Sequence, residues 1–134
     1  MKIDRHPRPT FSVEDANRAS DIIFGVKGKV FELAGERDRN FLITNNKNEK
    51  YVLKVCNPAD SDDVIDFQNK LLTHLSSNNS QWQWPLPLTD KNDDLIAYTH
   101  NSDDDEIRIR LLTFVDGIFL ADYYPHSPLS LIHI

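Results

Sequence analysis

The sequence contains one cysteine, no long hydrophobic run and no excess of basic residues, and each of these absences excludes a class of protein. Because Cys56 has no second cysteine to pair with, an internal disulfide is impossible, which is typical of the reducing cytoplasm. No stretch approaches the roughly 20 apolar residues that cross a bilayer. The basic start at residues 1–9 is not followed by the apolar core of a secretory signal. We therefore expect a cytoplasmic chain with no membrane partner.

The charge balance argues against nucleic-acid binding. Fifteen Lys and Arg residues stand against 21 Asp and Glu residues, which gives a formal net charge of −6. A non-specific duplex binder needs surplus cations to displace the counterions of the phosphate backbone. We therefore expect no nucleic-acid partner, although a small local anion site remains compatible with this balance.

Several familiar catalytic and metal-binding patterns are also missing. The five histidines show no HxxxH or HExxH spacing, and with one cysteine they offer no zinc site. The acidic run 103–105 lacks the glycine and the closing glutamate of an EF-hand loop, so we expect a solvated hairpin tip there. No phosphate-binding glycine motif and no nucleophile elbow occur. We therefore assign no metal ligand and no catalytic residue within the chain.

What remains is an ordinary globular composition, with 40% hydrophobic and 27% charged residues over 134 residues, enough for one domain. A helix is predicted over 12–24, capped by Ser12 and ended by Gly25. A second helix is predicted over 62–76, with an apolar stripe formed by Val64, Phe67, Leu71, Leu72 and Leu75. Alternating patterns predict five strands, at 29–33, 40–44, 50–56, 94–100 and 106–113.

Three features could carry chemistry or could be structural. Strand alternation places Lys54 on one face with Val52, where a lysine either extends to solvent at a sheet edge or meets an anion. Helical spacing places Gln68 within the apolar stripe, where it bonds either a backbone group or a functional group on the sheet. The link 35–40 either wraps phosphates with backbone N–H groups or is a plain hairpin turn.

The order of these elements, together with residues 33–41 (LAGERDRNF) and 51–55 (YVLKV), resembles the N-terminal lobe of the aminoglycoside phosphotransferase and choline kinase group of small-molecule kinases. The similarity is greatest to the hydroxylysine-kinase-like branch, including the phosphotransferase domains fused to class III aminotransferases, and it covers roughly residues 11–130. The resemblance implies an α+β fold: a five-stranded antiparallel sheet in the order 1-2-3-5-4, one packed helix, and a leading helix outside the sheet. The implied divisions are a lead-in at 1–10, the lobe at 11–117 and the start of a second lobe at 118–134.

The resemblance also implies roles for particular residues in nucleotide binding. Lys54 matches the lysine that holds the α- and β-phosphates of ATP, and Val52 matches the residue that packs on adenine. Gln68 occupies the position of the helix glutamate that pairs with this lysine, and Asp66 is the charged alternative, so the partner of Lys54 stays open. The remaining matches are to the nucleotide-covering loop and to the hinge that bonds the adenine edge: Gly35, Glu36, Arg37, Asn40, Leu112, Thr113, Phe114 and Val115.

The function implied by the resemblance is ATP-dependent phosphorylation of a hydroxylated amine or amino acid, with ATP and Mg²⁺ in the intact enzyme. Such kinases need a catalytic aspartate in an HGDxxxxN loop, and no His-Gly-Asp occurs in these 134 residues. We therefore expect the lobe alone to be inactive, to carry no bound cofactor and to bind nucleotide only weakly. We also expect it to self-associate through a bare apolar face around Val52 and Phe114. The alternative is a non-catalytic regulatory or adaptor module, such as the front domain of an aminotransferase fusion.

Overall fold

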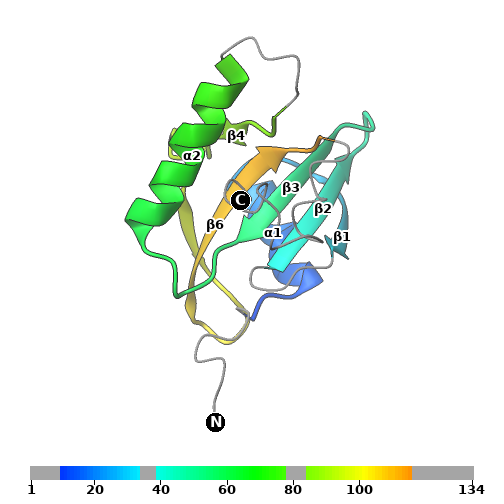
Figure 1. Cartoon of the computed structure of the whole chain (residues 1–134). Coiled ribbons are helices and arrows are strands. Elements are labelled where there is room, and N and C mark those ends of the chain that lie inside the picture. Colours follow the sequence, from blue (N-terminus) through cyan, green and yellow to red (C-terminus); the bar gives the residue numbers. More distant parts are fainter. Residues whose placement is uncertain (1–9, 34–38, 78–83, 116–134) are drawn as a thin grey trace.

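A computed structural model describes residues 10–33, 39–77 and 84–115, and it has an α+β fold (Figure 1). Within these residues two helices accompany strands that all pair in antiparallel fashion. In chain order the elements are α1 (Val13–Ile22), β1 (Gly28–Leu33), β2 (Arg39–Asn45), β3 (Lys50–Val55), α2 (Asp62–Ser77), β4 (Pro87–Leu88), β5 (Ala97–His100) and β6 (Glu106–Thr113).

The strand order confirms the expected arrangement and adds one strand to it. The path through the sheet is β1-β2-β3-β6-β4, and β5 also pairs with β6. The five expected strands therefore lie in the predicted order, but the count of five was wrong. The additional strand is β4, in which Pro87 and Leu88 pair with Leu112 and Leu111. Its two residues are too few to give the alternation by which a strand is recognised in a sequence.

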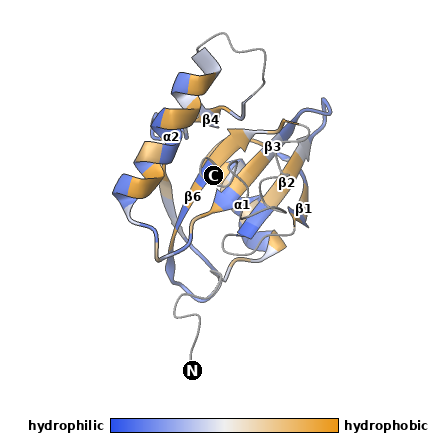
Figure 2. Ribbon diagram, viewed as in Figure 1, coloured by the Kyte–Doolittle hydropathy of each residue, from blue (hydrophilic) through white to orange (hydrophobic). Residues whose placement is uncertain are grey.

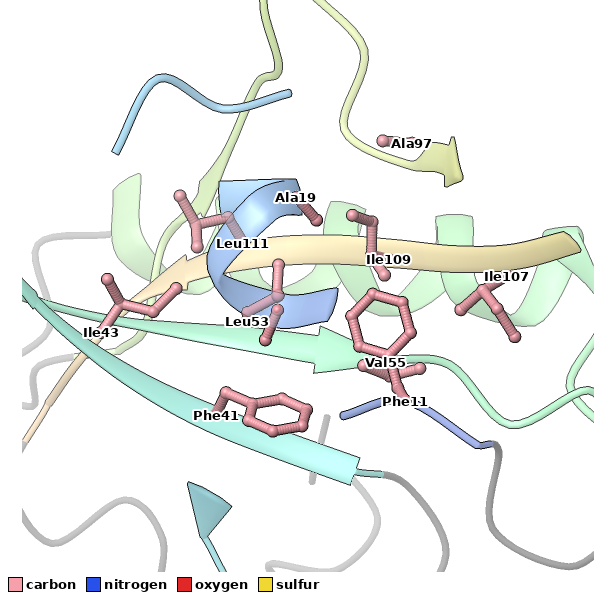
Figure 3. Packing of buried hydrophobic residues seen from close by; sticks show 11 residues of the cluster. Phe11, Ala19, Phe41, Ile43, Leu53, Val55, Ala97, Ile107, Ile109 and Leu111 are labelled. Carbon is pink, nitrogen blue, oxygen red and sulfur yellow. The ribbon is translucent and has the colours of Figure 1, made fainter. Parts of the chain in front are cut away.

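The hydrophobic core lies between the sheet and α1, which Figure 1 shows behind the strands. The core-facing residues of β2, β3 and β6 are apolar and almost fully buried, and Figure 3 shows them meeting Phe11 and Ala19. The leading helix therefore lies outside the sheet, as expected, and it covers one face of the sheet. An apolar sheet face must be covered, and the small side chains of Ala16 and Ala19 let α1 approach it closely.

A reciprocal cap at its first turn fixes the start of α1. The Asp15 N–H donates to Ser12 Oγ at 3.0 Å, and the Ser12 N–H donates to Asp15 Oδ2 at 3.1 Å. The Asp15 carboxylate also accepts hydrogen bonds from Arg18 at 2.8 Å and from the Ser102 hydroxyl at 2.9 Å, which links α1 to the hairpin between β5 and β6. Burial acts to raise the pKa of Asp15, but the hydrogen bonds from Ser12, Ser102 and Arg18 outweigh it and hold the pKa below its usual range.

Replacing Asp15 with asparagine should therefore destabilise the protein in a pH-dependent way. A carboxyl group whose pKa is lowered by folding stabilises the folded state above the pKa of the unfolded chain, and this contribution is lost as the pH falls below about 4. We expect a loss of about 1 kcal/mol at pH 7 that is smaller at pH 3, measured by thermal unfolding at both pH values. Glu14→Gln, an exposed change in the same helical turn, is the control. An Asp15→Asn deficit that stays constant from pH 7 to pH 3 would contradict the role given to this carboxylate.

Helix α2 lies along the side of the sheet formed by β6 and β4 (Figure 1). Ser61 Oγ accepts a hydrogen bond from the Val64 N–H at 3.2 Å and so caps the start of the helix. The predicted apolar stripe was partly wrong, because Val64 and Phe67 are 44% and 62% exposed. The buried residues of α2 are Ile65, Asn69 and Leu72. The helix is rotated because the sheet face beneath it carries charged side chains, which select amide groups rather than a continuous apolar stripe.

The bare apolar face expected around Val52 is absent. Val52 and Leu112 are 2% and 4% exposed, and Leu112 packs against Leu72 and Trp84. Figure 2 shows hydrophobic residues concentrated along the sheet, with polar residues in the turns. In the described part of the chain, the large hydrophobic residues that are exposed lie elsewhere: Val13, Ile22, Phe31, Val64, Phe67, Leu86 and Tyr98. Self-association stays a prediction, but it can no longer be argued from Val52. Neither described helix is long and apolar enough to cross a membrane.

Candidate nucleotide-binding site

Three polar residues form a row across the α2-facing side of the sheet. Asn40 on β2 is the register partner of Lys54 on β3, and Lys54 is the register partner of Arg110 on β6. All three are between 1% and 2% exposed. Side chains in register on neighbouring antiparallel strands lie about 4.5–5.5 Å apart at Cβ. The fold therefore brings two buried cations together on one face, although 56 positions separate them in the sequence.

Lys54 is held from the neighbouring strand. Its ammonium group donates a hydrogen bond to Asn40 Oδ1 at 2.9 Å. Because β3 is the middle strand of the path β1-β2-β3-β6-β4, Lys54 cannot extend to solvent past a sheet edge. Of the two interpretations of Lys54 that the sequence allows, extension to solvent at a sheet edge is therefore excluded.

Helix α2 binds Arg110 through two amides. Arg110 Nη1 donates to Asn69 Oδ1 at 2.6 Å, and Arg110 Nη2 donates to Gln68 Oε1 at 3.1 Å. Gln68 thus faces the sheet as predicted, but the hydrogen-bond partner found for it is Arg110. Asp66 lies on the outer side of the helix, where it forms an ion pair with Lys70 at 3.0 Å. The charged alternative for the partner of Lys54 is therefore directed away from the sheet.

The first turn of α2 is fixed to β5 and β6. Asp62 accepts a hydrogen bond from Arg108 at 2.9 Å and another from the Tyr98 hydroxyl at 2.9 Å. The hydrogen bond from Arg108, followed by that from Tyr98, holds the pKa of Asp62 below its usual range, and the same contact with Asp62 raises the pKa of Tyr98. Arg108 also donates to the Asn57 carbonyl at 2.9 Å, which fixes the loop before the helix.

An apolar area lies beside the two cations. Val52 on β3 and Leu112 on β6 are register partners, two residues along each strand from Lys54 and Arg110, so they share the same face. In the segment that follows, residues 112–115, some of the backbone N–H groups already donate hydrogen bonds to neighbouring segments of the chain. The Thr113 N–H donates to the Leu86 carbonyl at 3.0 Å, and the Phe114 N–H donates to the Lys50 carbonyl at 3.3 Å. Val115 is half-buried.

The remaining predicted residues are only partly covered by the structure. Gly35, Glu36 and Arg37 lie outside the described residues. Across residues 10–33, 39–77 and 84–115, no group of three or more His, Cys, Asp or Glu side chains could hold a metal ion.

Sequence reasoning missed two residues of this site, Arg110 and Asn69. The alternation of Arg108 and Arg110 with three apolar residues of β6 was visible, but it did not show that this face meets the lysine face. Asn69 was missed because the helix stripe was placed one residue away from its true position.

Comparisons with known proteins identify the family and the fold of the chain. The family model described as "Phosphotransferase enzyme family" matches residues 30–131. Among solved structures, a microcompartment-associated aminopropanol kinase superposes with a TM-score of 0.66 at 15% identity, covering 79% of this chain and 32% of that kinase. An amicoumacin kinase in complex with AMP-PNP, Ca²⁺ and its ligand superposes with a TM-score of 0.65 at 14% identity, covering 80% of this chain and 32% of that kinase. No curated protein matches the chain. The chain therefore spans about a third of the length of the kinases whose fold it shares.

Proposed function

Because the chain belongs to the phosphotransferase enzyme family, we propose that it is the ATP-binding N-terminal lobe of a small-molecule kinase in which Lys54 holds the nucleotide phosphates. The observation that carries this proposal is the buried pair of cations, Lys54 and Arg110, in register on the α2-facing side of the sheet. Lysine and arginine are the side chains with which proteins bind phosphates, and here one of each lies on the same face of the sheet. The phosphates of a nucleotide are a ligand that matches this pair.

The residues around Lys54 fit a nucleotide. The ammonium group is oriented by an amide oxygen, which accepts a hydrogen bond without cancelling the positive charge. The apolar side chains of Val52 and Leu112 lie two residues away on the same strands and make the area beside Lys54 apolar, which suits an adenine ring. In the segment 112–115 the N–H groups of Thr113 and Phe114 already donate within the sheet. We therefore propose that the Val115 N–H donates a hydrogen bond to the edge of the adenine ring, and that carbonyl groups of the same segment accept hydrogen bonds from it.

The described residues position ATP but do not complete the chemistry. When bound, ATP supplies the γ-phosphoryl group that is transferred. Phosphoryl transfer depends on a positioned acceptor and on metal ions that neutralise the developing charge. The described residues contain no carboxylate cluster for Mg²⁺, so in this proposal the metal ligands and the catalytic aspartate belong to a second lobe. The 134-residue chain is accordingly expected to be inactive alone.

The proposed acceptor is a hydroxylated amine or amino acid. One of the kinases with the same fold is named for aminopropanol, a small molecule that carries both an amine and a hydroxyl group. This support comes from likeness of fold, since none of the described residues of the chain selects an acceptor.

An ATP derivative whose γ-phosphate carries an acyl group tests this function. An amine beside the terminal phosphates attacks the acyl carbonyl, the acyl–phosphate bond breaks, ATP leaves, and a stable amide forms on the lysine. We expect mass spectrometry to find acylated Lys54, and we expect excess ATP to suppress it. Lys70, which is exposed on the outer side of α2, is the internal control, because its acylation should not respond to ATP.

Two results would overturn the proposal. One is Lys54 that stays unmodified while exposed lysines react. The other is Lys54 acylation that excess ATP leaves unchanged. Either result would favour the non-catalytic adaptor module instead.

A further inference from the structure

The two buried cations of the site are held from opposite sides by different elements. Lys54 is held by Asn40 of β2, and Arg110 is held by Gln68 and Asn69 of α2. We propose that Asn40 is the positioning residue for Lys54, and that Arg110 instead of Lys54 docks α2 onto the sheet. This inference rests on the proposed function for its consequence in nucleotide binding, but its structural part can be tested without nucleotide.

Asn40 suits the orienting role because of its place in the sheet. It is the register partner of Lys54, so a short side chain reaches the ammonium group across a single strand spacing. It is 1% exposed, which shields the hydrogen bond from competing water. Both strands belong to the middle of the sheet, so this contact moves with the sheet and not with the helix.

The amides of α2 are engaged elsewhere. Asn69 is fully buried and accepts the shorter of the two hydrogen bonds from Arg110, at 2.6 Å. Gln68 accepts the second, at 3.1 Å. A guanidinium group offers donors in a planar fork, so one arginine can hold two amide oxygens that are adjacent on a helix.

Alternate residues of β6 extend this attachment along the helix. Arg108 holds Asp62 at the start of α2, and two residues later Arg110 holds the middle of the helix. Two residues further, Leu112 packs against Leu72. Three successive positions on one face of a single strand therefore fix α2, and none of these contacts involves Lys54. Loosening α2 should then leave the orientation of Lys54 largely intact.

A pair of matched substitutions separates the two roles. Asn40→Leu removes the Asn40 Oδ1 acceptor of Lys54, and Asn69→Leu removes the Asn69 Oδ1 acceptor of Arg110, each with a side chain of similar size. Three quantities are measured in both variants: the AMP-PNP dissociation constant, the rate at which a small amine-acylating reagent modifies Lys54, and amide hydrogen exchange in α2.

We expect Asn40→Leu to weaken AMP-PNP binding about tenfold, corresponding to one hydrogen bond to a charged group. It should also raise the modification rate of Lys54 and leave hydrogen exchange in α2 unchanged. We expect Asn69→Leu to raise hydrogen exchange between residues 65 and 72, with AMP-PNP affinity and Lys54 reactivity within about twofold of the unmodified chain.

If Asn40→Leu fails to fold, the Asn69→Leu variant alone tests whether α2 orients Lys54. A loss of AMP-PNP affinity or a changed Lys54 reactivity in Asn69→Leu would show that α2 orients Lys54 and would overturn the proposal. Asn40→Leu with unchanged Lys54 reactivity would also overturn it. If the unmodified chain binds no AMP-PNP, the proposed function fails, but Lys54 reactivity and α2 exchange still confirm or overturn the assignment of Asn40 and Arg110.

Discussion

Replacing Phe41 with alanine should lower the free energy of unfolding by about 3–5 kcal/mol. Phe41 is fully buried at the centre of the core, and its ring meets that of Phe11 edge to face, with centroids 6.2 Å apart. The substitution removes the apolar transfer energy of the ring, the aromatic contact, and the packing that surrounds the cavity left behind. Because domains of this kind have only about 5–15 kcal/mol of stability in total, the loss should be plain in urea unfolding at 25 °C.

Phe31→Ala is the matched control for this effect. Phe31 belongs to the neighbouring strand β1 and is 66% exposed, so its removal should change stability by no more than about 0.5 kcal/mol. Equal losses in the two variants would show that the core does not lie on the α1 side of the sheet.

Replacing Lys54 with methionine should weaken AMP-PNP binding by about tenfold to 150-fold. Methionine keeps an unbranched side chain of similar length but removes the charge, and a hydrogen bond to a charged group contributes about 1.5–3 kcal/mol. The substitution should change the dissociation constant of AMP-PNP more than it changes the free energy of unfolding. The variant removes a buried charge, which relieves its desolvation cost, while the hydrogen bond to Asn40 is lost, so the two effects on stability oppose each other.

The strands and helices were largely predictable because local rules dictate them. Alternation of apolar and polar residues over 106–111 marked β6, and the capping residue Ser12 marked the start of α1. The two-residue strand β4 could not be predicted, because it exists only through pairing with β6. The packing of α1 on the core also depends on a contact far away in the sequence, between the helix and the sheet face.

The position of Lys54 in the candidate site could be predicted from the sequence, but the residues that surround it could be predicted less well. The period of two placed Lys54 and Val52 on one face from the sequence alone. The row from Asn40 through Lys54 to Arg110 needed the register between three strands, which the sequence pattern does not fix. The exposed Phe67 illustrates a second limit, since the apolar pattern of α2 was compatible with two rotations of the helix. The buried arginine on the sheet selected the rotation that presents Gln68 and Asn69.

The most direct test of the central claim, that Lys54 lies at the phosphates of a bound nucleotide, is an AMP-PNP titration of the chain with Mg²⁺, followed by amide chemical shifts. The account predicts saturable shifts at residues 52–55 and 112–115. Lys54→Met should raise the dissociation constant at least about tenfold, whereas Lys70→Met, which removes only an exposed pair with Asp66, should match the unmodified chain. An unmodified chain without saturable shifts, or a Lys54→Met variant that binds AMP-PNP as tightly as Lys70→Met does, would contradict the claim.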